Sequence, residues 1–507
     1  MELAHDAAGT YPSAVPARAG AAADGSEWLK PGGSDPLVID LDGTLLRTDS
    51  LLECALVFLR RNPLGLFQLL FWLIRGRAVL KQELARRVPI DPAAWPINAE
   101  LEAFARGEKQ GGRKVFLATA ADQAVARSVA DRCGFFDGVF ASNGRTNLKG
   151  PQKLAVLTQE FPDGFAYAGD SRADYPIWAR ASEAILVGER AWTRRAARRF
   201  ANTSRIFRKP SCLLALLECG RPHQWAKNTL VFVPAVLGGV LADVGPMVSA
   251  AICFAALCIT ASATYVLNDL VDVHDDREHW TKRKRPIASG RLPVSTAAAA
   301  VVAGLAAGLL LAFLANPKAC LVLAGYLLLT VAYSFRLKRV PILDVVVLAG
   351  LFTTRLLLGI VAAGVFASPW LLVFSMFLFT SLCFAKRYTE VERAAERGKT
   401  ALASRGYVAR DSALIFALGI GTGIASIIIM VLYVIFDAYR QTFYGNTLWL
   451  WAFPVILFLW FARVWLVAAR GELDDDPVAF AVNDGPSILL GGAILAAFLL
   501  AWSGLFA

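Results

Sequence analysis

Two aspartates that follow a short apolar run are the first residues in the chain with the chemistry for phosphoryl transfer. Asp40 and Asp42 lie in the motif D-L-D-G-T, directly after the run P-L-V-I. If this run is a strand, both carboxylates leave its carboxyl end, where open α/β sheets bind their ligands. One carboxylate can attack phosphorus while the second transfers a proton. The spacing therefore predicts a hydrolytic phosphate site.

Later positions supply the remaining parts of such a site. Thr119 ends the apolar run K-V-F-L-A, Lys149 lies in N-L-K-G, and Asp170 and Asp174 follow the run F-A-Y-A-G. A hydroxyl and a cation can bind phosphoryl oxygens, and the added carboxylates can hold Mg²⁺. Lys153, four residues beyond Lys149, could take its place. All of these residues end predicted strands or lie in the loops beyond them.

The order of these motifs resembles the haloacid dehalogenase superfamily of phosphatases. The resemblance implies an α/β Rossmann-like domain over residues 34–188, with a helical cap at about 45–112. It makes Asp40 the nucleophile and Asp42 the general acid/base. The phosphate and Mg²⁺ ligands that it implies are Thr119, Lys149, Asp170 and Asp174, with Asp40 and Asp42 also serving the ion. Residues 51–80 are unusually hydrophobic for a soluble domain, which favours a helix of the cap or a helix that rests on the membrane surface.

A second acidic cluster ends a long apolar segment. Asn268, Asp272 and Asp276 are spaced i, i+4, i+8, and Asp269 is three residues before Asp272, so a helix would place their oxygens on one face. Like charges this close are unfavourable without a cation, and oxygen ligands suit Mg²⁺ bridging to a diphosphate. A run of basic residues follows and could bind phosphates. Alternatively, their charge only fixes the orientation of the segment in the membrane. These residues are Lys282, Arg283, Lys284, Arg285 and Arg291.

A third constellation contains Tyr333, Lys338, Asp344 and Arg355. Asp344 and Arg355 are eleven residues apart, which returns them to nearly the same helix face. An arginine this deep in an apolar segment is costly unless it lines a cavity or meets an anion. Lys386 opens a further basic cluster, for which ordinary positive-inside charge is an equal interpretation.

The composition indicates a membrane protein. Of the 507 residues 56% are hydrophobic and 18% charged, with a net charge of +11 and a mean hydropathy of +0.49. The positive excess suits anionic headgroups or phosphates and gives no indication of nucleic acid. The cysteines are scattered without a C-x-x-C pair, which supports neither zinc nor a disulfide framework.

Nine apolar segments after residue 221 predict an all-α transmembrane bundle. Lysine and arginine gather in the even-numbered connections, so the positive-inside rule predicts an inner (cytoplasmic) membrane protein with a cytoplasmic N-terminal domain and its C-terminus outside. Residues 1–33 are expected to be a disordered lead, and residues 189–220 a basic interfacial linker, or alternatively a solvated helix. The segments run over Thr229–Ala242, Met247–Leu267, Val294–Ala315, Ala319–Phe335, Val345–Val365, Pro369–Ala385, Ala413–Phe436, Thr447–Phe461 and Ser487–Ala507.

The second and third constellations resemble the UbiA superfamily of intramembrane transferases over residues 221–507. Within it, R-P-H-Q-W-A-K-N from Arg221, K-R-Y-x-E from Lys386 and D-P-V-x-x-A-x-x-D from Asp476 are most similar to phosphoribosyltransferases of polyprenyl (decaprenyl) phosphate. Ordinary members carry a second D-x-x-x-D, but here Leu348 stands four residues after Asp344. This departure puts an allylic diphosphate donor in doubt.

The resemblance implies a Mg²⁺-dependent transfer of 5-phosphoribose from phosphoribosyl pyrophosphate to polyprenyl phosphate, followed by a dephosphorylation in the fused phosphatase. The sequence leaves open whether the protein forms a homo-oligomer. The alternatives are a prenyltransferase with a prenyl diphosphate donor and an aromatic or other acceptor, and a transporter with a phosphatase-like regulatory module. The implied metal ligands are Asn268, Asp269, Asp272 and Asp276, and the three aspartates are also the implied catalytic acids. The implied substrate ligands are Lys227, Lys282, Arg283, Arg285, Tyr333, Lys338, Asp344, Arg355 and Lys386.

Overall fold

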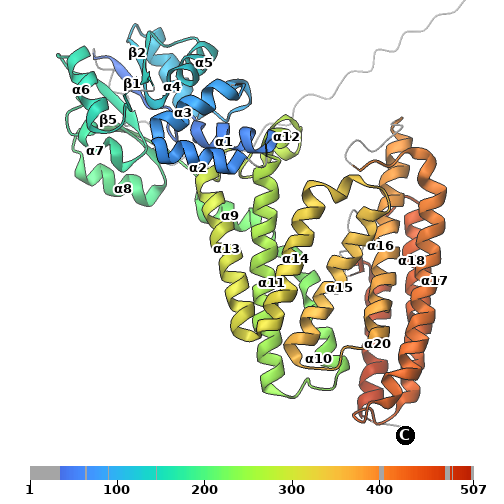
Figure 1. Ribbon diagram of the computed structural model, residues 1–507. Helices are drawn as coiled ribbons and strands as arrows, with labels where there is room; N and C mark the ends of the chain where they lie inside the picture. The colour runs from blue at the N-terminus through green and yellow to red at the C-terminus, as the bar shows by residue number, and fades with distance from the viewer. Residues whose placement is uncertain are drawn as a thin grey trace, which may run out of the picture. The chain divides into compact units, whose positions relative to one another are not determined.

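The computed structural model shows two compact units (Figure 1). It describes residues 35–62, 65–89, 91–143, 146–398, 405–473, 480–481 and 483–503. The sheet unit comprises residues up to 54 together with 64–209, and the helical unit comprises residues 55–63 together with 210–507. The lead expected over residues 1–33 lies outside the described residues.

The sheet unit contains six parallel strands in the order β3-β2-β1-β4-β5-β6. Strands β1 and β4 are fully buried, as expected for the centre of a parallel sheet that helices cover on both faces. The strand order changes direction between β1 and β4, and ligands bind at such a switch point. The α/β prediction is confirmed. The strands are β1 (Leu37–Ile39), β2 (Val115–Asp122), β3 (Gly138–Ser142), β4 (Ala166–Gly169), β5 (Glu183–Gly188) and β6 (Thr203–Arg208).

Helices connect these strands, and four of them fill the region where a cap was predicted. Residues 45–112 contain α1 (Ser50–Arg61), α2 (Leu66–Arg75), α3 (Arg77–Arg87) and α4 (Ala99–Gln110). The remaining helices of the sheet unit are α5 (Gln123–Cys133), α6 (Pro151–Glu160), α7 (Tyr175–Trp178) and α8 (Arg190–Arg199).

The sheet unit extends further along the chain than predicted. Residues 189–209 form α8 and β6 rather than the start of a linker, and β6 pairs in parallel with β5. Ala196, Phe200 and Phe207 are buried, while most of the arginines stay exposed. The basic charge therefore covers the outer surface of a packed element, because the apolar residues between the arginines face the core.

The helical unit contains, among the described residues, eight helices long and apolar enough to cross a membrane. Large apolar side chains such as Leu321 and Leu328 are exposed on them, as lipid-facing residues are. This supports a multi-pass integral membrane protein. The long helices are α11 (Val244–Val271), α13 (Val294–Ala315), α14 (Pro317–Phe335), α15 (Leu343–Ala363), α16 (Pro369–Glu396), α17 (Ser412–Phe436), α18 (Ala452–Ala469) and α20 (Gly485–Ser503); α9 (Cys212–Gly220) and α12 (Val273–Glu278) are shorter.

The first predicted span, Thr229–Ala242, does not form a long helix. The chain makes a 3-10 helix over Pro222–Phe232 and the short α10 (Val233–Leu237), so the prediction of nine regular spans is wrong by one. Figure 1 shows α9 and α10 near opposite ends of the helical unit, so this segment still crosses it. Its backbone packs closely on α15, where a Cβ at Gly359 would clash with the carbonyl oxygen of Val231. The predicted orientation of the termini stays a prediction.

Candidate active sites

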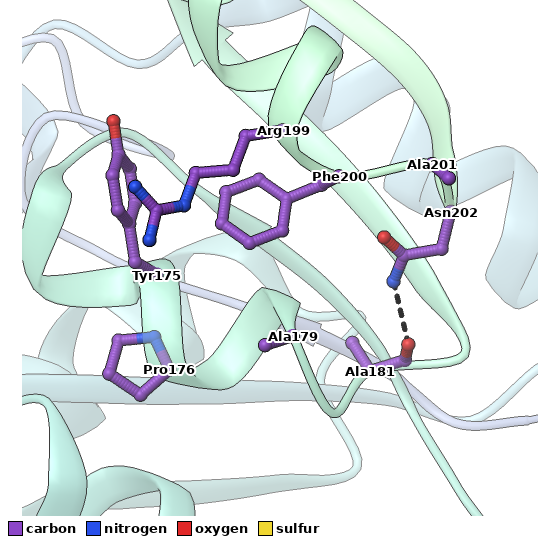
Figure 2. Close-up of a pocket in the computed structure, with 8 residues that line it drawn as sticks. All are labelled: Tyr175, Pro176, Ala179, Ala181, Arg199, Phe200, Ala201 and Asn202. Carbon is purple, nitrogen blue, oxygen red and sulfur yellow. Dashed lines mark hydrogen bonds between the residues drawn. The ribbon is translucent and has the colours of Figure 1, made fainter.

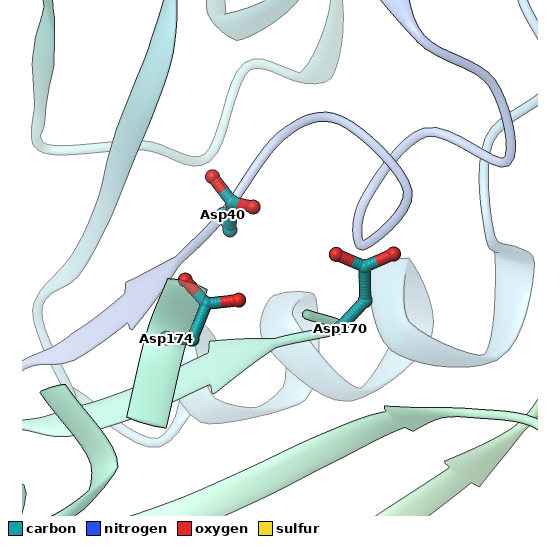
Figure 3. A group of neighbouring side chains, drawn as sticks. All are labelled: Asp40, Asp170 and Asp174. Carbon is teal, nitrogen blue, oxygen red and sulfur yellow. The ribbon is translucent and has the colours of Figure 1, made fainter. Parts of the chain in front are cut away.

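Three carboxylates meet at the switch point of the sheet (Figure 3). Asp40 directly follows β1, and Asp170 and Asp174 follow the neighbouring strand β4. Each offers an oxygen atom, and these atoms all lie within 4.8 Å of one another. Parallel strands bring these side chains to one edge, as their positions in the sequence predicted. Asp42 lies two residues further on, where its Oδ1 accepts a hydrogen bond from the Ser50 amide at 2.8 Å.

The lysine that the structure brings to these acids is Lys153, the alternative to Lys149 that the sequence offered. Lys153 is 3% exposed, and its ammonium lies 2.7 Å from Oδ1 of Asp40. It also donates to the hydroxyl of Tyr167, which in turn donates to Asp174 at 2.9 Å. Lys149 is exposed in the loop before α6. Since α6 begins at Pro151, Lys153 lies in its first turn and reaches the acids.

The electrostatics of this cluster call for a cation. Burial, together with the charges of Asp174 and Asp170, raises the pKa of Asp40 to about 7, and Lys153 opposes this shift. Burial likewise raises the pKa of Asp42 to about 6 and that of Asp170, although Lys209 lies 2.8 Å from Asp170. A divalent ion would stabilise the ionised carboxylates, and an oxygen-only ligand set fits Mg²⁺. Asp40, Asp170 and Asp174 are the residues that would hold it.

A small pocket beside Asp42 includes a cation that sequence inspection missed. Its lining includes Asp42, Ser50, Asp122 and Lys81 of α3. Lys81 donates to the carbonyl oxygen of Ala120 at 2.5 Å, at the carboxyl end of β2. The sequence could not indicate this contact of Lys81, because it depends on how the cap helices fold onto the sheet.

Thr119 lies on β2, two residues beyond Leu117, which pairs with Ile39 just before Asp40, and a larger pocket in the sheet unit is lined by other residues. Thr119 is buried on β2, and its hydroxyl accepts from the Ala121 amide at 3.0 Å, so its phosphate role stays a prediction. The pocket of about 740 Å³ in Figure 2 is lined by eight residues without a carboxylate, and Arg199 lies over the Tyr175 ring within it. Its lining contains no carboxylate, histidine or cysteine.

In the helical unit, the second acidic cluster forms at the junction of α11 and α12. The amide of Asp272 donates to Asn268 and the amide of Asp276 donates to Asp272, both at 2.9 Å, so the helical spacing continues through the junction. Asp269 and Asp276 are buried, whereas Asn268 and Asp272 are half-buried. The predicted convergence of these residues is therefore present in the structure.

Two arginines bind these acids. Nη1 of Arg285 lies 3.0 Å from Asp269 and 2.7 Å from Asp276, and Arg221 lies 2.7 Å from Asp269. Burial raises the pKa of Asp276, and Arg285 opposes that shift. Arg221 begins the motif R-P-H-Q-W-A-K-N, but its type and spacing alone did not indicate this contact. Its left-handed backbone, with φ of 51°, is the local feature that turns the chain here.

One carboxylate oxygen in this cluster still lacks a hydrogen bond. Oδ1 of Asp276 is buried without a hydrogen-bond partner among the described residues, and the ammonium of Lys282 is 3.9 Å away. A buried unsatisfied carboxylate oxygen is costly, so it marks a place for a cation. Asp269, Asp272, Asp276 and Asn268 offer the oxygen atoms that Mg²⁺ prefers. Arg283 is exposed.

Asp344 and Arg355 of the third constellation each bind side chains from other parts of the helical unit. Asp344 is 0% exposed; it accepts from Nε of Arg387 at 2.7 Å and from the Tyr407 hydroxyl at 2.6 Å. Arg355 donates to the side-chain oxygen of Asn228 at 3.0 Å. Both residues are buried on α15, where Asp344 binds Arg387, and their substrate roles stay predictions. The sequence prediction missed Arg387, although the adjacent Lys386 was selected.

The remaining predicted ligands are dispersed. The Tyr333 hydroxyl accepts from Arg405, and the ammonium of Lys386 lies 3.9 Å from Glu390. Lys227 and Lys338 are half-buried in 3-10 helices. Their substrate roles stay predictions. The motif that begins at Asp476 lies largely outside the described residues.

Comparisons with known proteins place these sites in a family context. An uncharacterized protein of Sinorhizobium fredii is 40% identical over 92% of this chain and 91% of its own. Nodulation protein NoeC of Azorhizobium caulinodans is 33% identical over 56% of this chain and 92% of its own. Decaprenyl-phosphate phosphoribosyltransferase of Corynebacterium glutamicum is 38% identical over 35% of this chain, which covers 54% of that enzyme.

A solved structure and a family model also match the helical unit. The structure of a UbiA homolog from Archaeoglobus fulgidus bound to DMAPP and Mg²⁺ is 16% identical, with a TM-score of 0.42, over 56% of this chain and 99% of that one. The model of the UbiA prenyltransferase family matches residues 231–484, half of the chain. The chain therefore belongs to the UbiA prenyltransferase family.

Proposed function

We propose that the helical unit transfers 5-phosphoribose from phosphoribosyl pyrophosphate to a polyprenyl phosphate such as decaprenyl phosphate. The similarity to the C. glutamicum phosphoribosyltransferase supports this choice of substrates within the family. The observation that carries the proposal is that Asp344 is already occupied by hydrogen bonds within the protein. Because Arg387 and Tyr407 bind both of its oxygens and Leu348 stands where a second acid would be expected, the acids around Asp276 remain as the diphosphate site.

The acids and arginines at this junction suit a ribose donor. Asp269, Asp272 and Asp276 would hold Mg²⁺, which would neutralise charge on the diphosphate of the donor. Arg221 and Arg285, which bind those acids in the structure, can turn to phosphate oxygens when a diphosphate enters. A phosphate oxygen of the lipid attacks C1 of the ribose, the bond between C1 and the pyrophosphate oxygen breaks, and pyrophosphate leaves. The fixed positive charges stabilise the leaving group.

We further propose that the sheet unit is a phosphatase that removes the 5-phosphate from the lipid-linked product. Asp40 attacks phosphorus as the ester bond breaks, and Asp42 gives a proton to the departing oxygen. Water then hydrolyses the aspartyl phosphate. Lys153 holds Asp40 ionised and oriented, since its ammonium lies 2.7 Å from the attacking carboxylate.

Labelled donors separate this proposal from its alternative, a prenyltransferase of the kind the family name describes. The purified full chain is given polyprenyl phosphate with ribose-labelled phosphoribosyl pyrophosphate, or an aromatic acceptor with labelled prenyl diphosphate, each with Mg²⁺. The proposal expects label in the lipid fraction from the ribose donor alone. Transfer from the prenyl donor alone would replace the proposal by the alternative.

The lysines of the sheet unit provide a test within the phosphatase site. Lys153→Met is expected to lower phosphatase turnover about 100-fold, because the buried carboxylate nucleophile loses its cation. Lys149→Met, in the exposed loop before α6, is expected to change it less than about twofold. Release of inorganic phosphate measures both. Equal losses in the two variants would show that Lys153 has no special role.

The pair between Asp344 and Arg387 is expected to stabilise the helical unit. Arg387→Met would leave a fully buried carboxylate without its cation, which typically costs about 3–5 kcal/mol. Lys386→Met, one residue earlier on a half-exposed side chain, is expected to cost under about 1 kcal/mol. Thermal unfolding in detergent measures both. Adding Asp344→Asn to Arg387→Met should restore part of the loss, and no restoration would contradict a specific pair.

A further inference from the structure

Helix α2 turns an apolar face outward from the sheet unit. Leu69 and Trp72 lie on its inner side, where Trp72 is 7% exposed and packs under the guanidinium of Arg87 at 4.7 Å. The outer face carries the side chains of Leu66, Phe67, Leu70, Phe71, Leu73 and Ile74, all exposed, with Ile74 at 85% and Phe67 at 72%. A contiguous apolar surface of this kind on a packed domain marks an interaction site.

The charges around this face identify its partner as anionic. The sequence from Cys54 to Gln82 contains arginine and lysine but no aspartate or glutamate. Arg75 ends α2 and Arg77 begins α3, both are exposed, and the guanidinium of Arg75 lies 5.7 Å from the centre of the Phe71 ring. Apolar side chains flanked by arginines suit the boundary between acyl chains and anionic headgroups. A second copy paired symmetrically through α2 would instead bring like charges together.

The length of α2 decides how it can meet a bilayer. Ten residues make a helix of about 15 Å, half the thickness of the hydrocarbon core of about 30 Å, so α2 can lie in the interface but cannot cross. The sheet unit is also continuous at Lys209 with the membrane-spanning helical unit, so the chain itself keeps it near a bilayer. A surface helix therefore needs only modest affinity to stay inserted.

We propose that α2 lies in the headgroup region of an anionic bilayer and holds the sheet unit against the membrane surface. The apolar face enters the acyl boundary, and Arg75 and Arg77 bind lipid phosphates. This inference goes beyond the proposed function, because it holds whatever reaction the sheet unit catalyses.

Photo-crosslinking in the full-length protein tests the proposal. The full chain is reconstituted in vesicles of phosphatidylcholine with phosphatidylglycerol, carrying p-benzoylphenylalanine in place of Phe71. The matched control carries it in place of Glu160, an exposed residue at the end of α6. After illumination, mass spectrometry of the peptides is expected to show phospholipid adducts at position 71, at least about tenfold more than at position 160.

A charge-reversed variant tests the role of the arginines. Arg75→Glu with Arg77→Glu is expected to lower the lipid adduct at position 71 at least about fivefold in the anionic vesicles. Adducts at position 71 to a second copy, or to another segment of the same chain, would overturn the proposal. Equal lipid adducts at positions 71 and 160, or a yield that the charge reversal leaves unchanged, would overturn it as well.

Discussion

Asp40→Asn is expected to lower phosphatase turnover at least about 1,000-fold, because the variant keeps the shape of the site but loses the attacking oxygen. Phosphate release from a small phosphate ester measures turnover. The transfer of ribose label into lipid, measured on the same preparation, is expected to be unchanged.

The control for this variant is Asp131→Asn, at an exposed aspartate on α5, which should keep wild-type phosphate release. If Asp40→Asn retains more than about a tenth of the wild-type turnover, Asp40 is not the nucleophile. The acid cluster would then have another use.

Asp276→Asn is expected to lower ribose transfer at least about 100-fold, because it removes a ligand from the proposed Mg²⁺ site and one of the two acids that Arg285 binds. Asp275→Asn changes the neighbouring aspartate, whose side chain is 60% exposed, and is expected to keep most of the transfer activity. The incorporation of ribose label into lipid measures both variants. Equal losses would mean that α12 matters for stability and not for binding the donor.

A second readout separates metal binding from catalysis in the same pair. Mn²⁺ can replace Mg²⁺ and is detected by electron paramagnetic resonance. The Asp276→Asn protein should bind less Mn²⁺ in the presence of phosphoribosyl pyrophosphate, and the Asp275→Asn protein should bind as the wild type does. Unchanged Mn²⁺ binding by Asp276→Asn would assign the loss of activity to another cause.

Much of the fold could be predicted because its signals are local. The run that contains Leu37–Ile39 and the run that contains Ala166–Gly169 are apolar throughout, which is typical of central parallel strands, and each is followed by its acids. The long apolar helices follow from segment length. The basic stretch around β6 was harder, because its arginines hide the alternation of residues that pack on the sheet.

The limits of the site prediction have physical reasons. Lys149 and Lys153 are one helical turn apart, and only the start of α6 at Pro151 decides which of them reaches Asp40. In the sequence, Arg387 is one of several basic residues in a predicted cytoplasmic connection. Only the packing of the helices shows that it pairs with Asp344. Partners that lie far apart in sequence, such as Arg355 and Asn228, depend on how the helices pack, which periodicity within one segment cannot show.

The most direct test of the account follows two labels in a single donor. Phosphoribosyl pyrophosphate carrying ¹⁴C in the ribose and ³²P at the 5-position is incubated with polyprenyl phosphate, Mg²⁺ and the full chain. Wild-type protein is expected to deliver ¹⁴C to the lipid fraction and to release the ³²P as inorganic phosphate, whereas Asp40→Asn is expected to deliver both labels in equal amounts. Absence of ¹⁴C from the lipid fraction with the wild-type protein would rule out the proposed ribose transfer.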